Sequence, residues 1–190
     1  ILSRLYRDIG NFKICEKYLK ECEKYYKKNR NSSIYKEIIE DFCVLYQHLS
    51  NFDKALEYCD KLYTLAKETN DKEYELVSYQ QYTFIYSKLD DSNKKEEYLE
   101  KAFILAKELN NSFILAHLYQ SKAVDNMNNY EYIKALDNLN KALELYKIQE
   151  NISMINHIYH KIGYVYYQLF DYKKSLVYLN WSYKFFDRNR

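Results

Sequence analysis

The feature that most constrains the fold of this chain is a register that returns every 40 residues without a gap. Five segments align in this register, beginning at positions 11, 51, 91, 131 and 171. Within each segment, small or apolar residues recur three or four positions apart, as Cys59, Leu62 and Leu65 do. That spacing is typical of an amphipathic helix. A fixed period of this length predicts a repeat architecture in which each unit packs on its neighbours.

The segments between these five also repeat, and a small residue marks the same place in each. This small column holds Ser3, Cys43, Thr83, Ala123 and Gly163. A glycine inside a helix costs about 1 kcal/mol relative to alanine, so Gly163 needs a packing reason. We expect the first helix of each unit to cross the second at the small residue, which lets the two backbones approach closely.

The composition favours an all-α chain. Its 190 residues include no Pro and two Gly, which is typical of long helices joined by short polar links. The predicted helices cover residues 1–9, 12–28, 32–49, 52–69, 72–89, 92–109, 112–128, 131–149, 152–169 and 172–187. Short polar side chains stand at the breaks and are expected to cap the helix that follows; they are Asn11, Asn51, Asn111, Asn151 and Asp171.

Charge and hydropathy exclude two classes of partner. Lys and Arg number 29 against 27 Asp and Glu, and the two signs are interspersed, so no nucleic-acid partner is indicated. No apolar run reaches the roughly 18 residues that a membrane span needs, and no secretory signal opens the chain. We therefore expect a cytoplasmic protein without a membrane partner. Because the chain begins with Ile and ends among aromatic residues, we interpret it as a fragment of a longer protein.

The cysteines predict packing rather than chemistry. Cys43 belongs to the small column, Cys15 and Cys22 take places that hold alanine in other segments, and Cys59 takes the place of Leu99. No CxxC spacing occurs, and free cysteine behaves as a small buried hydrophobe. Two glycines cannot form a phosphate-binding loop, and no nucleophile and base stand at a usable spacing. We expect no catalytic residue, no metal, no cofactor and no enzymatic activity.

The histidines are the remaining candidates for a metal site. His117 and His157 share a column in neighbouring units, and His160 lies one turn from His157, so the three are candidates for one surface. A zinc site needs a fourth ligand and a closed shell around it, and neither can be recognised in the sequence. We interpret these histidines as polar surface residues.

The columns resemble the tetratricopeptide repeat family. In the last unit the family's pattern is matched by Tyr159, Ile162, Gly163, Tyr166, Ser175, Leu179 and Ser182. The family's usual period is about 34 residues, so the longer period here implies longer helices. Another departure is Asn126, which stands where Tyr is expected. The resemblance implies a right-handed α-solenoid of antiparallel helix pairs in one domain over 1–190. That domain would hold a partial unit at 1–28 and units at about 31–69, 71–109, 111–149 and 151–187.

The resemblance also implies a binding surface, because the first helices of this family line a concave channel for a peptide or a partner's helix. Transferred position by position, the channel here comprises Glu40, Val44, Gln47, Gln80, Phe84, Ser87, His117, Gln120, Val124, Met127, His157, His160, Tyr164 and Tyr167. No recurring packing position accounts for Phe84, Met127 and Tyr164. Their presence therefore favours binding over the alternative of merely solvated helix faces. The family's clamp for paired carboxylates is not expected, because its places hold neither Lys nor Asn. They hold Glu40, Gln80, Gln120 and His160.

Two functions follow as hypotheses. The first is a protein- or peptide-binding module that serves as the sensory or scaffolding part of a larger, bacterial-type signalling or regulatory protein. The alternative is a peptide-pheromone-sensing domain of a transcription regulator or phosphatase regulator, because those domains have similar long, tyrosine-rich repeats. The last helix carries Trp181 and Phe185 and no polar capping helix follows, so we expect a further helix or a second copy to cover it.

Overall fold

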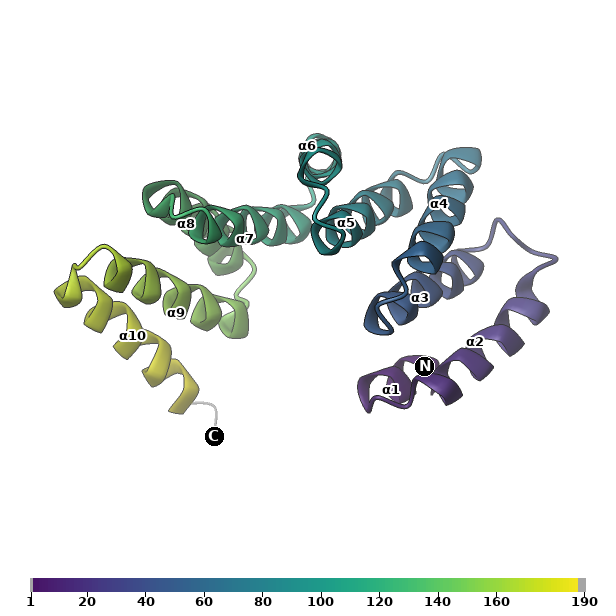
Figure 1. The fold of residues 1–190 in the computed structure, drawn as a ribbon, viewed down its shortest axis with the longest axis horizontal. Coiled ribbons are helices and arrows are strands. Elements are labelled where there is room, and N and C mark those ends of the chain that lie inside the picture. Colours follow the sequence, from purple (N-terminus) through teal and green to yellow (C-terminus); the bar gives the residue numbers. More distant parts are fainter. Residues whose placement is uncertain (1, 188–190) are drawn as a thin grey trace. The chain divides into compact units, whose positions relative to one another are not determined.

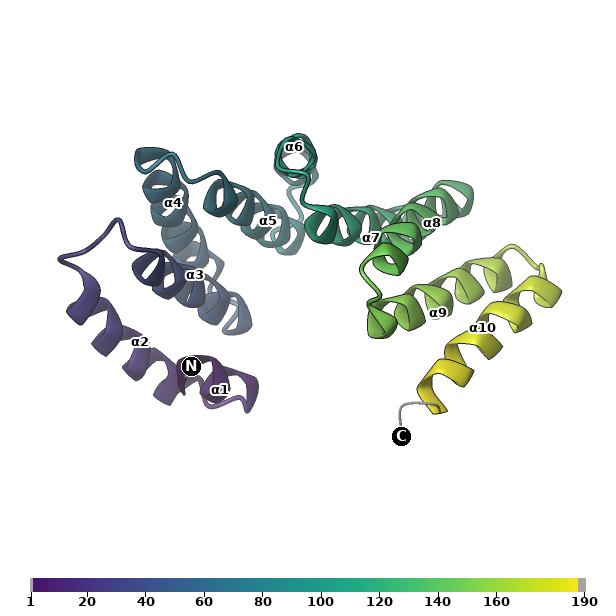
Figure 2. The ribbon, with the colours of Figure 1, turned by 180° about the vertical axis from the view of Figure 1, so that it is seen from behind.

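The computed structural model describes the backbone of residues 2–187, and within that range it contains ten helices and no strand (Figures 1 and 2). Side chains are described from Ser3 to Tyr183. The helices are α1 (Leu2–Asp8), α2 (Phe12–Tyr26), α3 (Ser33–His48), α4 (Phe52–Glu68), α5 (Lys72–Lys88), α6 (Ser92–Glu108), α7 (Ser112–Asn128), α8 (Tyr132–Ile148), α9 (Ile152–Gln168) and α10 (Tyr172–Asp187). All the predicted helices are confirmed, with ends within two residues of the predicted ones.

Links of three residues explain why the register is so regular. After α8, Glu150 adopts a left-handed backbone with φ of 52°, and the N–H of Asn151 donates to the carbonyl of Tyr146 at 3.0 Å. The Asn151 side chain then accepts from the N–H of Met154 at 3.2 Å. One asparagine therefore closes one helix and caps the next. A seventeen-residue helix and this link make up 20 residues, which is half of the sequence period.

Left-handed residues recur at the same point of almost every link. They are Gly10, Ser50, Asn70, Asp90, Asn110, Tyr130, Glu150 and Phe170. Only the longer link between α2 and α3 lacks one among the described residues. Since glycine is the residue that tolerates this conformation without strain, the other seven residues carry a local cost.

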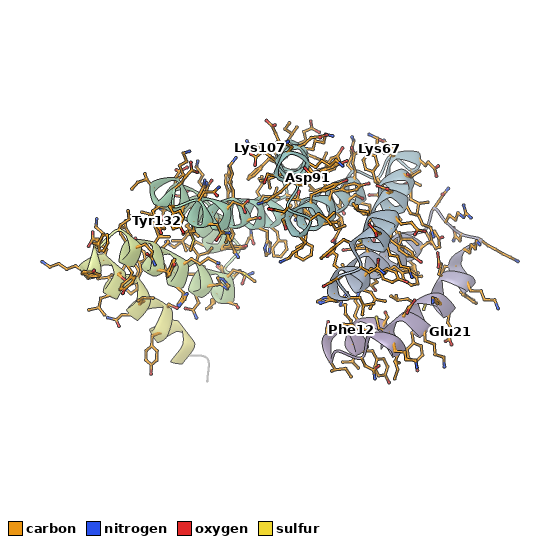
Figure 3. The ribbon with its side chains drawn as sticks, in the orientation of Figure 1. Phe12, Glu21, Lys67, Asp91, Lys107 and Tyr132 are labelled. Carbon is orange, nitrogen blue, oxygen red and sulfur yellow. The ribbon has the colours of Figure 1, made fainter. Side chains whose placement is uncertain are left out.

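The predicted N-caps are confirmed. Each predicted cap side chain accepts a hydrogen bond from the backbone N–H three residues ahead; the caps are Asn11, Asn51, Asn111, Asn151 and Asp171. Asp91, labelled in Figure 3 at the start of α6, caps Lys94 in the same way at 3.0 Å. α8, near whose start Tyr132 is labelled, differs because Glu131 makes no side-chain cap bond.

The helices form two compact units, residues 1–105 and 106–190, and the division falls within α6. In unit 1, α3 packs on α4 and α4 packs on α5. In unit 2, α7 pairs with α8 and α9 with α10, and α8 packs on α9, so that the hairpins lie side by side (Figure 1). The extent of a single domain over 1–190 stays a prediction.

The small column lies where the paired helices touch, as the register predicts. All five of its residues are buried. A Cβ atom added to Gly163 would lie 2.8 Å from Cγ of Leu179 on α10, which is closer than real contacts allow. Glycine at this position therefore lets α9 and α10 approach closely.

In most of the helix pairs, two stacked tyrosines join the two helices near the link. In unit 1 the ring of Tyr46 stacks on that of Tyr58 with centroids 5.5 Å apart, and in unit 2 Tyr166 stacks on Tyr178 at the same distance. A lysine covers the free face of the first ring, as Lys54 covers Tyr46 at 5.0 Å. The aromatic content of the chain is therefore largely explained by packing.

The expectation that Cys22 is packed like the alanines in its column is wrong. Cys22 is exposed, and Tyr25 on the same helix is 79% exposed, whereas Leu62 and Leu65 at the equivalent places on α4 are buried. The difference arises from the length of the helix that precedes each of these two helices and packs on it. α1 has 7 residues and α3 has 16, so α1 covers only the beginning of α2.

Candidate functional site

In unit 1 the predicted surface runs along α3 and α5. Nε2 of Gln47 on α3 donates to Oε1 of Gln81 on α5 at 2.7 Å, so the two helices are joined directly. Phe84 on α5 is 43% exposed, and the hydroxyl of Ser87 donates to the carbonyl of Phe84 at 2.6 Å. Phe84 is therefore a large apolar side chain on a polar helix face.

The N-terminal end of this surface is an ion network. Nε of Arg4 donates to Oδ1 of Asp41 at 2.9 Å, and Nη1 of Arg7 approaches the same oxygen at 3.4 Å. Nη2 of Arg4 also reaches Glu37 at 3.3 Å. Burial raises the pKa of the Glu40 carboxyl above its ordinary value of 4.5, and the neighbouring charge of Asp41 raises it further. The arginines thus pair with Asp41 and Glu37, while the Glu40 carboxyl is held in a desolvated position.

In unit 2 the predicted residues of α7 turn partly toward the core. The ring of His117 lies edge to face between Phe113 at 4.7 Å and Tyr146 at 5.6 Å, and burial lowers its pKa below 6.5. Oε1 of Gln120 accepts a hydrogen bond from the Tyr146 hydroxyl at 3.3 Å. Met127 packs against the hydrophobic core of this unit, so the expectation that it lacks a packing role is wrong.

The predicted residues of α9 are exposed to solvent. His157 and His160 are exposed, Tyr164 is 44% exposed and Tyr167 is 56% exposed. Burial, and then the charges of Lys161 and His160, lower the pKa of His157 below 6.5. The remaining predicted residues are half-buried; they are Val44, Gln80 and Val124. The role of the whole set in binding stays a prediction.

Two residues next to this set, Gln81 and Lys161, were missed. They share a column with Asp41 and stand 40 and 120 residues from it. In the structure Asp41 and Gln81 both bond to a residue 34 positions earlier in the chain. The signal in the sequence was a column that is polar in four successive units, with Asp41, Gln81, Ser121 and Lys161.

The end of α10 was predicted to associate with another helix or another copy. Trp181 is 43% exposed and contacts Tyr159 and Tyr178 with ring centroids 5.4 and 5.0 Å apart. The side chain of Phe185 lies outside the described residues. Self-association therefore stays a prediction.

The described part of the chain contains neither a cluster of metal ligands nor a membrane-spanning helix. No group of three or more His, Cys, Asp and Glu side chains there could hold a metal ion. Three of the cysteines, Cys15, Cys43 and Cys59, are buried as free thiols. None of the described helices is long and apolar enough to span a membrane.

No protein-family model matches the sequence, and no curated protein matches it. Solved structures of repeat proteins are similar in fold. BtubC from P. vanneervenii is 17% identical with a TM-score of 0.80, and the similarity covers 98% of this chain and 78% of BtubC. A signal transduction ATPase with numerous domains and a tetratricopeptide repeat sensor, from Pyrococcus horikoshii, is 20% identical with a TM-score of 0.80. The similarity covers 97% of this chain, and this chain spans only 28% of the length of that ATPase.

Aspartyl phosphate phosphatase F from Bacillus subtilis is also similar, with 11% identity and a TM-score of 0.67. That similarity covers 97% of this chain and 47% of the phosphatase. At such identities the similarities establish the fold alone. The chain has the all-α, tetratricopeptide-type helical repeat fold that the columns implied.

Proposed function

We propose that this chain is a protein- or peptide-binding module, rather than an enzyme, and that it binds through the faces of its first helices α3, α5, α7 and α9. Repeat proteins of this fold type expose a row of side chains on those helices, since each hairpin is packed only on its neighbours. The similar structures support an interaction role of this kind.

The observation that carries the proposal is the pair Phe84 and Tyr164. They stand two periods apart in one column, on α5 and α9, and are 43% and 44% exposed. Packing does not account for these two rings, because the residues at the same place on α3 and α7, Val44 and Val124, are much smaller. Half-exposed aromatic side chains are enriched where proteins bind partners, because they offer a large contact area at a low entropic cost.

The finer role that we propose is the sensory or scaffolding part of a larger cytoplasmic signalling protein. Two features support it. The ATPase of similar fold carries a repeat domain described as a sensor, and this chain spans only part of that protein. The three buried free thiols of this chain fit a reducing compartment.

A second candidate is a peptide-pheromone-sensing domain of a transcription regulator or phosphatase regulator. The observation that favours it is the similarity in fold to aspartyl phosphate phosphatase F over nearly the whole chain. A helix-turn-helix domain before this segment in the full-length protein would favour the second candidate over the first.

The test is a selection of binders from a displayed library of random peptides, made with wild type and with the double variant Phe84→Ala and Tyr164→Ala. The control is the double variant Ile104→Ala and Ile148→Ala, which truncates two exposed apolar residues on the second helices α6 and α8; both are more exposed than Phe84 and Tyr164. We expect wild type and the control to enrich the same peptides and the first double variant to lose them. Enrichment that all three proteins share would overturn the proposed surface, and no enrichment by wild type would overturn peptide binding itself.

A further inference from the structure

One lysine in unit 2 lacks the counter-ion that comparable lysines have. Burial lowers the pKa of Lys161 on α9, and no carboxylate among the described side chains pairs with it. In unit 1, by contrast, Nζ of Lys36 lies 2.6 Å from Oδ2 of Asp71 and Nζ of Lys61 lies 2.5 Å from Oε1 of Glu23. The desolvation of the Lys161 ammonium is therefore not offset within this structure.

The repeat register explains why the partner is missing. A residue of one first helix bonds to a residue 34 positions later on the next first helix, as Arg7 does with Asp41 and Gln47 does with Gln81. The same spacing pairs Lys161 with Met127. A thioether is at most a weak acceptor and carries no charge, and Met127 packs against the core of unit 2. The residue that stands at the partner position of Lys161 in this register, Met127, therefore cannot neutralise it.

The surroundings of Lys161 are positive and partly aromatic. α9 contains no Asp or Glu from Ile152 to Gln168, and His157 lies one turn before Lys161 on the same helix. The charge of Lys161 is one of the causes that lower the pKa of His157, so the two side chains share one electrostatic environment. Tyr164, 44% exposed, stands three residues after Lys161.

Two acids at the helices that pack on α9 are paired with other lysines. On α8, Asp137 accepts from Lys141 at 2.6 Å, and at the start of α10 Asp171 pairs with Lys174 at 3.1 Å. An external carboxylate is thus the group that this surface can accommodate with a gain in free energy, because a charge-assisted hydrogen bond would offset the desolvated ammonium.

We propose that Lys161, with His157 beside it, binds the carboxylate of an Asp or Glu side chain in the peptide ligand, next to an apolar residue that contacts Tyr164. The inference rests on the proposed function, since it specifies the chemistry of the ligand at that same surface. A peptide fits better than a nucleic acid because the charges of the chain are mixed and nearly balanced, with a formal net charge of +2. Lys161 also lies outside the places of the family's carboxylate clamp.

The test repeats the peptide selection with wild type, Lys161→Met, and the control Lys141→Met, which removes an exposed lysine of α8. A selected peptide that contains Glu is then synthesised with Glu or with Gln at that position. Fluorescence anisotropy measures the affinity of both peptides for each protein, and circular dichroism verifies that each protein is folded. A second variant, Lys161→Gln, keeps the proposal testable if methionine disturbs the fold.

We expect the Glu-to-Gln change to weaken binding to wild type and to Lys141→Met about tenfold, and to have little effect on binding to either Lys161 variant. If the peptides selected by the wild-type protein contain no Asp or Glu, the inference is overturned and the proposed function remains. The same holds if the Lys161 variants still prefer the Glu peptide over the Gln peptide. Absence of any selected peptide would overturn both. Selective binding of an RNA oligonucleotide through Lys161, without selection of acidic peptides, would also overturn the inference.

Discussion

Nδ2 of Asn138 donates a hydrogen bond to Oδ1 of Asn126 at 2.9 Å, at the place where the other repeats stack two tyrosines. Both asparagines are 8% exposed. Nδ2 of Asn126 continues the network to Oε2 of Glu131 at 2.7 Å, and Glu131 is the N-cap residue of α8 that makes no cap bond. One repeat has therefore exchanged an aromatic contact between its two helices for a polar one.

The first prediction concerns this exchange. Asn126→Tyr and Asn138→Tyr should each destabilise the protein by about 1–3 kcal/mol, because each leaves a buried amide without its partner. The double variant rebuilds the tyrosine pair of the other repeats and should lose less than the sum of the two, with a coupling energy of about 0.5–3 kcal/mol. Urea denaturation of the four proteins measures this. Strictly additive losses would show that the two positions act independently.

The second prediction concerns the helix crossing at Gly163. Gly163→Ala should lower the free energy of unfolding, because the contact of the new methyl group with Leu179 costs about 1–3 kcal/mol and outweighs the gain of about 1 kcal/mol in helix propensity. In a Leu179→Ala background the same change should become neutral or stabilising. Thermal melts of the two pairs of proteins check this. A loss of the same size in both backgrounds would contradict the role assigned to the crossing.

The third prediction concerns the left-handed residues of the links. Glu150 has a φ of 52° and is exposed, so Glu150→Gly should stabilise the protein by about 1 kcal/mol through release of backbone strain. Glu144→Gly, an exposed change inside α8, should instead destabilise by about 1 kcal/mol. Opposite shifts of the melting temperature are expected for the same substitution six positions apart. Shifts of one sign would contradict the assigned backbone conformation.

The fourth prediction is a pH dependence that originates at His117. Burial holds the pKa of His117 in the folded protein below its ordinary value of 6.5. As the pH falls below 6.5, the unfolded chain therefore takes up this proton before the folded protein does, and stability decreases. Denaturation curves at a series of pH values should show a smaller decrease for His117→Phe than for wild type. His160→Gln, at an exposed position, serves as the control and should behave like wild type.

Much of this fold could be predicted because its causes lie close together in the chain. Asn151 caps its helix through a hydrogen bond to a backbone N–H three residues away, so its role can be read from a short segment. The small column recurs at a fixed spacing and is buried in every unit, and at Gly163 it marks the crossing of α9 and α10. Because the pattern repeats, the caps and the burial of the small column are each confirmed several times within one sequence.

The burial of particular side chains could not be read in the same way. Cys22 and Leu62 share a column, yet Cys22 is exposed because the helix over it is short. Met127 had no packing column and nevertheless lies against the core of unit 2. In each case the outcome depends on the length and side chains of a neighbouring helix, which the column does not record.

The amino-acid sequence by itself determined the helices, their caps, their period and the positions where they cross, because all of these follow from backbone hydrogen bonds and side-chain spacing over a few residues. Only the tertiary structure decided which side chains are exposed to solvent and which charges have no counter-ion. Whether Lys161 has a counter-ion depends on the side chains of neighbouring helices, because α9 itself contains no Asp or Glu. Such pairings are set by packing across helices, where the free energy of a charge depends on every group around it.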